Sequence, residues 1–132
     1  MPRFAAIAGV FVVLLLSGCA GTAGDDAAAA SVAVAFESAL SSGDGDAACA
    51  LLTANTRTVL EDEEGACATA ITALGLDGGG AVERSRAYAR AAHVLLENDV
   101  LFLALEPAGW RVNAAGCTAQ ADRPYLCDLE GK

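Results

Sequence analysis

Between residues 27 and 42 the apolar side chains recur at every fourth position. Val32, Phe36 and Leu40 form a single stripe when this segment is drawn as a helix. Such a spacing is typical of a helix that buries one face and leaves the other to solvent. The pattern therefore predicts a helix over 27–42 that ends at Gly43, where the backbone can leave the helical conformation.

Shorter segments with helical spacing follow. They are residues 47–52, a turn that contains Val59 and Leu60, and residues 66–74. We expect Asp46 to cap the first segment and Thr56 the second, since both side chains can accept a hydrogen bond from a backbone amide. In the third segment, Cys67, Ile71 and Leu74 share a face. Helices this short need tertiary packing to be stable.

The consecutive acidic residues 61–64 precede Gly65. A calcium-binding loop alternates its ligands with other residues over about a dozen positions. Consecutive acidic side chains point in different directions, so they do not converge on one cation. The run therefore predicts a solvated turn and not a cation site.

Beyond the turn at 77–80, the hydrophobic pattern changes to a period of two. Strands are predicted at 82–88, 91–97, 100–106 and 110–115, and the first two could instead form one long bent strand. Asn98 with Asp99 suits a tight turn, as do residues 107–109. The chain thus predicts an α+β fold, in which N-terminal helices pack on a curved antiparallel sheet of three to four strands.

The second predicted strand has two different faces. Ala92, Val94 and Leu96 share one face, and His93 and Leu95 share the other. A lone histidine could act as a general base, but no acidic partner is identifiable from the spacing. We therefore expect His93 to be a half-exposed strand residue.

The net charge of −9 excludes several functions. It argues against nucleic-acid binding, because no basic patch is available to displace counterions. It also argues against electrostatic docking on anionic lipid headgroups. The sequence has no phosphate-binding loop, no paired-histidine metal motif and no dinucleotide fingerprint, so we expect no cofactor and no metal.

The N-terminal segment has the build of a secretory signal. Arg3 precedes an apolar run over residues 4–16, which as a helix would span about 20 Å. A bilayer hydrocarbon core is about 30 Å thick, so this run is too short for a stable membrane span. Export across the cytoplasmic membrane is therefore expected.

Leu16, Ser17, Gly18 and Cys19 resemble the bacterial lipobox. This resemblance implies cleavage between Gly18 and Cys19 and attachment of lipid to Cys19. The expected organisation is a signal peptide over 1–18, a lipidated cysteine and flexible tether over 19–26, and one domain over 27–132. Two or more acyl chains would hold the protein on the outer face of the cytoplasmic membrane.

The remaining cysteines are even in number: Cys49, Cys67, Cys117 and Cys127. An even set outside the cytoplasm suggests disulfides, and three pairings are open. We favour Cys49 with Cys67 and Cys117 with Cys127, because each pair lies in one local segment. A zinc site normally contains closely spaced cysteine pairs, which this chain lacks.

Several short segments carry a resemblance to known families: 91–94, 100–103, GWRV at 109–112, AAGC at 114–117 and DRPYLC at 122–127. They resemble small lipoproteins of high-GC Gram-positive bacteria and the SnoaL-like pattern of the nuclear transport factor 2 superfamily. The resemblance implies a curved sheet around a cone that can hold a ligand, an active site or a partner surface. Enzymes of that superfamily use inward-facing Asp and His pairs, whereas this chain offers His93 alone.

A candidate pocket therefore comprises Tyr88, His93, Phe102 and Trp110. Trp110 is expected to pack inside the sheet, with a ligand-stacking role as the alternative. The favoured function is a lipid-anchored extracytoplasmic module that binds an envelope protein or a small apolar ligand. One alternative is a small SnoaL-like isomerase or hydratase that uses His93 with Tyr88 or an acid. Another is a structural envelope component.

Overall fold

The computed structural model describes residues 22–132. Its elements are α1 (Thr22–Ser41), α2 (Gly45–Ala50), α3 (Ala54–Glu64), α4 (Cys67–Ala73), β1 (Val82–Tyr88), β2 (Ala91–Leu96), β3 (Val100–Glu106), β4 (Gly109–Thr118) and β5 (Leu126–Glu130). The expected signal peptide over 1–18, its cleavage after Gly18 and the lipid attachment at Cys19 lie outside the described residues. None of the described helices is long and apolar enough to cross a membrane.

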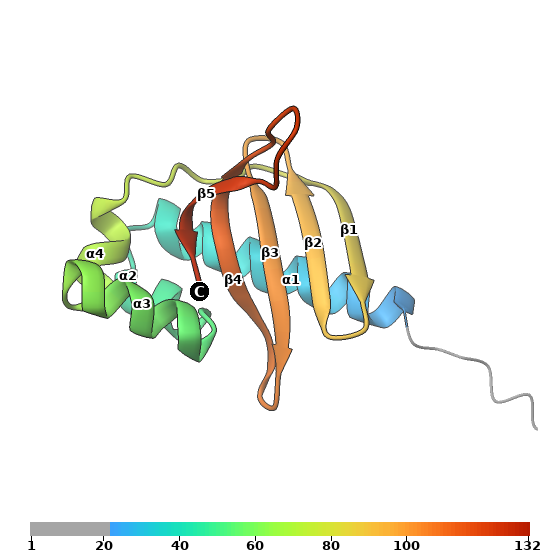
Figure 1. The fold of residues 1–132 in the computed structure, drawn as a ribbon. Coiled ribbons are helices and arrows are strands. Elements are labelled where there is room, and N and C mark those ends of the chain that lie inside the picture. Colours follow the sequence, from blue (N-terminus) through green and yellow to red (C-terminus); the bar gives the residue numbers. More distant parts are fainter. Residues whose placement is uncertain (1–21) are drawn as a thin grey trace, which may run out of the picture.

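The fold is a helical layer on an antiparallel sheet, which confirms the α+β class. The strands lie side by side in the order β1-β2-β3-β4-β5, and every neighbouring pair is antiparallel. Helix α1 runs across one face of this sheet, and α2, α3 and α4 gather beside β4 and β5 (Figure 1). In the described residues the sheet has five strands, one more than the upper limit predicted.

The additional strand is β5, which follows the loop after β4. Its five residues, LCDLE, are too few and too polar to show a clear alternation. The strand pairs with β4, and Cys117 and Cys127 lie opposite each other in the β4–β5 register and are joined by a disulfide. The chain after β4 therefore folds back as a hairpin whose second arm is β5.

Helix α1 begins earlier than predicted, at Thr22. A flexible tether was expected over 19–26, but its described part is helical. The reason is a contact that the local sequence does not reveal. The carboxylate of Asp26 accepts a 2.6 Å hydrogen bond from the backbone N–H of Ala87, and the Asp26 carbonyl accepts a 2.7 Å bond from the Ser85 hydroxyl. These bonds hold the start of α1 against β1.

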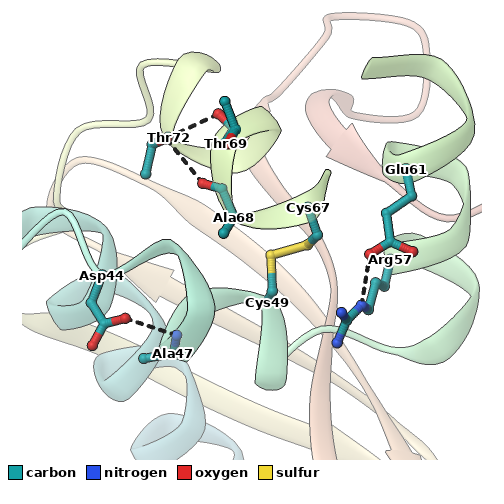
Figure 2. The surroundings of a disulfide bond; sticks show 9 residues. All are labelled: Asp44, Ala47, Cys49, Arg57, Glu61, Cys67, Ala68, Thr69 and Thr72. Atoms are coloured by element: carbon teal, nitrogen blue, oxygen red, sulfur yellow. Dashed lines mark hydrogen bonds and ion pairs between the residues drawn. A yellow bond between two sulfur atoms is a disulfide. The ribbon is translucent and has the colours of Figure 1, made fainter. Parts of the chain in front are cut away.

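The short helices begin at other caps than those predicted. Asp44, not Asp46, caps α2 and accepts a 3.0 Å hydrogen bond from the Ala47 amide (Figure 2). Thr53, not Thr56, caps α3, and its hydroxyl accepts a 3.1 Å bond from the Thr56 amide. In both cases the predicted residue lies inside the first turn, where its side chain cannot reach the free amides.

The acidic run 61–64 is the last turn of α3 and not a separate turn. Its side chains are exposed to solvent, as expected. Arg57 pairs with Glu61 one helical turn away at 3.0 Å, and Lys132 pairs with Glu63. Gly65 then ends the helix with a positive φ of 93°, a conformation that glycine adopts at little cost.

The core lies between α1 and the sheet. Ala29, Ala33 and Phe36 are fully buried on the sheet-facing side of α1. Val94 and Leu96 of β2 are buried opposite them, while His93 and Leu95 are only partly buried. The predicted alternation along this strand is therefore correct. Small alanines let the helix approach the sheet closely, and Phe36 fills the space between them.

Both favoured disulfides are present. Cys49 of α2 is bonded to Cys67 of α4, as Figure 2 shows, and Cys117 is bonded to Cys127. The first bond ties together two helices of six and seven residues, which are too short to be stable alone. The second closes the loop between β4 and β5.

Candidate functional site

The sheet has an open face on the side away from α1. No described helix crosses this face, which is turned toward the viewer in Figure 1. His93 of β2 and Phe102 of β3 lie opposite each other in the strand register and project on this side. An uncovered sheet face that carries large side chains is a natural location for a binding surface.

Three rings meet on the open face: His93, Phe102 and Tyr125, which we call the aromatic cluster. The ring centroids are 5.0 Å apart for His93 and Phe102, 5.1 Å for Phe102 and Tyr125, and 5.9 Å for His93 and Tyr125. These separations are typical of favourable aromatic pairs. Tyr125 comes from the loop between β4 and β5, whose ends the Cys117–Cys127 bond holds together.

A groove of about 420 Å³ lies beside the aromatic cluster. Its apolar lining is Phe102, Ala114, Pro124 and Tyr125, and its polar lining includes Asn113 and Glu130. The volume is within the range of pockets that hold small ligands, about 300–1,000 Å³. The groove could therefore accept a small apolar molecule or one large apolar side chain of a partner.

The surroundings of His93 favour its neutral form. Burial lowers the pKa of its imidazole, and the charge of Arg84 lowers that pKa further. The Nε2 atom is buried and has no hydrogen-bond partner in the described part of the chain. Because this atom is shielded from solvent, a ligand on the open face does not reach it in this arrangement. Among residues 22–132 no carboxylate is hydrogen-bonded to His93, so an Asp–His pair is not formed.

Two arginines of β1 border the open face. Arg86 lies opposite His93 in the β1–β2 register, and Arg84 lies opposite Leu95. The charge of Arg86 is partly neutralised by Asp26, whose carboxylate is 3.4 Å away. Arg84 and Arg86 thus place positive charge along one edge of the open face in a chain whose net charge is −9.

The structure brings together only part of the predicted pocket. His93 and Phe102 are in contact, but Trp110 is buried among the core residues, as expected, and Tyr88 is exposed at the end of β1. The prediction did not include Tyr125. Its only sequence signal is its position between two paired cysteines, and that signal does not show onto which face the loop folds.

An acidic pair, the buried Glu37 and the half-buried Asp99, lies at one end of the core. Glu37 of α1 is only 5% exposed, and its Oε2 atom accepts a 2.7 Å hydrogen bond from the Gly79 amide. Burial, first of all, and then the charge of Asp99 raise the pKa of Glu37 to about 7. Asp99 in turn accepts backbone hydrogen bonds from Val100 at 2.6 Å, Gly116 at 3.1 Å and Cys117 at 3.2 Å.

This pair has the character of a structural contact. The three amides bonded to Asp99 belong to the first residue of β3 and to two residues near the end of β4. A cavity of about 230 Å³ adjoins Asp99 and also contains Asp77 and Asp128. Within residues 22–132, however, no group of three or more metal-binding side chains could hold a metal ion. The acidic pair therefore links α1 to the sheet and offers no cation site.

On geometric grounds the open face of the sheet is the strongest candidate site. Comparing the chain with protein-family models, with curated proteins and with solved structures gives no match. The function must be inferred from the aromatic cluster, the adjoining groove and the charges around them.

Proposed function

We propose that this chain is a lipid-anchored binding module on the outer face of the cytoplasmic membrane. Its binding surface is the open face of the sheet. The observation that carries this proposal is the aromatic cluster beside a groove of about 420 Å³. Partly exposed aromatic side chains next to a concavity are typical of interaction hot spots, because they bury much apolar area and lose little entropy on binding.

The ligand is an envelope protein that inserts an apolar side chain into the groove, or a small apolar molecule. The apolar rings of Phe102 and Tyr125 supply the contact area. Asn113 and Glu130 in the lining of the groove supply polar contacts. Arg84 favours a partner with negative charge near that edge of the site.

The extracytoplasmic location is supported by the cysteines. All four cysteines downstream of Cys19 are paired in disulfides. Disulfides persist in oxidising compartments outside the cytoplasm. Together with the lipobox-like sequence at Leu16–Cys19, this pairing favours an exported lipoprotein over a cytoplasmic domain.

The relationship to SnoaL-like lipoproteins is part of the proposal. It is supported by the order of elements, with helices first and an antiparallel sheet after them. No observation favours the isomerase or hydratase alternative, because His93 projects on the face away from α1 and has no carboxylate bonded to it in the described residues. A purely structural envelope role would require that the open face has no ligand.

Site-specific photocrosslinking in living cells tests the binding surface. Ala104 projects on the open face, between Ala91 and Arg111 in the strand register. Val34 is exposed on the outer side of α1 and is the matched control. We expect a photoreactive residue at position 104, but not at position 34, to capture a partner, and Tyr125→Ala to abolish the capture.

Two outcomes would contradict the proposal. One is equal capture from both positions. The other is no capture from position 104 combined with no ligand in the native mass spectrum of protein purified from membranes. The same mass measurement tests the anchor. The expected chain begins at Cys19, is heavier by the attached lipid, and gains four hydrogens on reduction of its two disulfides.

A further inference from the structure

The start of α1 is fixed beside the turn that joins β1 to β2. Asp26 is hydrogen-bonded to Ser85 and Ala87 and paired with Arg86, all on β1. Figure 1 shows the first turns of α1 close to the end of β1, where the chain turns into β2. The segment of α1 nearest to Cys19 therefore lies next to the β1–β2 turn.

The chain between Cys19 and this contact is short. Three residue steps separate Cys19 from Thr22, where α1 begins, and they span at most about 10 Å. Asp26 lies about 6 Å further along the helix. If Cys19 carries the lipid, as in the proposed function, the β1–β2 turn must lie close to the bilayer surface.

The β1–β2 turn carries side chains that suit this position. Tyr88 is 66% exposed and is the most exposed of the large apolar side chains in the described residues. Arg86 and Arg90 flank it and are also exposed. Tyrosine is enriched at membrane interfaces, where its ring and its hydroxyl contact different layers. Arginine can extend its charge to the headgroups while its stem covers apolar surface.

Acidic and basic groups are mixed around this turn. Arg86 is paired with Asp26, and the Arg90 guanidinium donates a hydrogen bond to a backbone carbonyl of β3. Asp25 lies in the first turn of α1. The contact of this turn with a bilayer therefore rests on the exposed Tyr88 ring and on the short distance to the anchor, and not on an excess of positive charge.

We propose that the β1–β2 turn, with Tyr88 at the end of β1 and Arg86 and Arg90 on either side of it in the sequence, rests on the bilayer surface and orients the anchored domain. The occupant of this surface is the bilayer that holds the lipid anchor. The inference rests on the lipid anchor of the proposed function. It has a consequence for the binding surface, because the loop that carries Tyr125 lies at the opposite end of the sheet (Figure 1) and points away from the membrane.

The outer side of α1 is the competing surface. Its exposed residues Ser31, Val34, Ala35 and Ser38 include no aromatic side chain. Such a surface lacks the rings that are enriched at membrane interfaces. The same helix provides a control position, because Val34 is 48% exposed on this outer side.

Fluorescence quenching in vesicles distinguishes the two surfaces. The full lipidated chain is placed in vesicles of phosphatidylglycerol and phosphatidylcholine, with brominated acyl chains that quench nearby tryptophans. Tyr88→Trp and Val34→Trp each add one reporter, and the unaltered chain gives the background from the buried Trp110. We expect several-fold stronger quenching at position 88 than at position 34, with or without phosphatidylglycerol in the vesicles.

The outcomes separate the anchor from the orientation. Protein that floats with the vesicles but shows equal quenching at both positions, or stronger quenching at 34, would overturn the orientation and leave the anchor intact. Protein that does not float with the vesicles would overturn the anchor and the orientation together. Quenching at 88 that appears only when phosphatidylglycerol is present would show that headgroup charge, and not the aromatic side chain, holds the turn at the bilayer, and would contradict the proposal.

Discussion

The Oε2 atom of Glu37 on α1 accepts a 2.7 Å hydrogen bond from the backbone amide of Gly79 in the loop before β1. The Oε1 atom is buried and has no hydrogen-bond partner among the described residues. The Glu37 carboxyl lies near the charge of Asp99. A Cβ atom at position 79 would lie 3.1 Å from Cδ of Glu37 and 3.0 Å from Cδ2 of Leu96. A side chain at position 79 would therefore force Glu37 or Leu96 to shift by a few tenths of an ångström.

The first prediction concerns the pH dependence of stability. Burial and Asp99 raise the pKa of Glu37 to about 7 in the folded chain, well above its ordinary value of 4.5. Between these two pH values the folded state holds a proton that the unfolded state has lost, so stability falls as pH rises. The loss reaches about 3 kcal/mol above the folded pKa.

Glu37→Gln tests this directly, because glutamine keeps a similar shape and cannot ionise. As pH rises from 4 to 8, we expect the unaltered chain to lose stability relative to Glu37→Gln. Chemical denaturation at each pH measures the unfolding free energy of both proteins. Glu64→Gln, at the exposed end of α3, controls for the loss of one acidic group. A difference that does not change with pH would contradict the prediction.

The second prediction concerns the contact between α2 and α4. Gly45 is buried, and a Cβ atom there would lie 2.3 Å from the backbone oxygen of Ala68. Gly45→Ala should therefore destabilise the protein by about 1–3 kcal/mol, although alanine is the better helix former. Gly24 on α1 has open space around it. Gly24→Ala should be neutral or stabilising by up to about 1 kcal/mol, and the opposite signs should be visible in denaturant midpoints.

The third prediction separates the two disulfides. Their sequence separations are 18 and 10 residues, and closing loops of these lengths contributes about 3 kcal/mol each to stability. Replacing either pair with alanines should lower the unfolding free energy by roughly that amount. Only the Cys117→Ala/Cys127→Ala variant should also lose crosslinking from position 104, because only this pair positions Tyr125. Equal loss of crosslinking in both variants, measured under folding conditions, would argue against that role.

The fourth prediction compares the two sides of α1. Phe36 is fully buried in the core, whereas Val34, two residues earlier, is exposed to solvent. Phe36→Ala should cost about 3–5 kcal/mol, because it leaves a cavity that small alanine neighbours cannot fill. Val34→Ala should change the unfolding free energy by less than about 0.5 kcal/mol. Thermal and denaturant unfolding of both variants would check the contrast.

The local features of the fold were predictable because they depend on residues close in sequence. The stripe of Val32, Phe36 and Leu40 indicated α1, and the alternation around His93 indicated β2 with its correct buried face. The pairing of the cysteines also followed from proximity along the chain. Both predicted caps were wrong. Asp44 and Asp46 have the same chemistry, as do Thr53 and Thr56, so the sequence alone did not show at which of the two residues each helix begins.

The sequence by itself determined the fold class and the buried face of β2, and it favoured the two cysteine pairs among three possible pairings, because spacing along the chain decides these features. Only the tertiary structure decided that Tyr125 joins His93 and Phe102, that Glu37 lies beside Asp99 and that Asp26 fixes α1 to β1. The physical reason is that these contacts join residues 23 to 62 positions apart along the chain or lie across a folded loop. Their energies arise from burial and close approach, which exist only once the helix and the sheet have packed together.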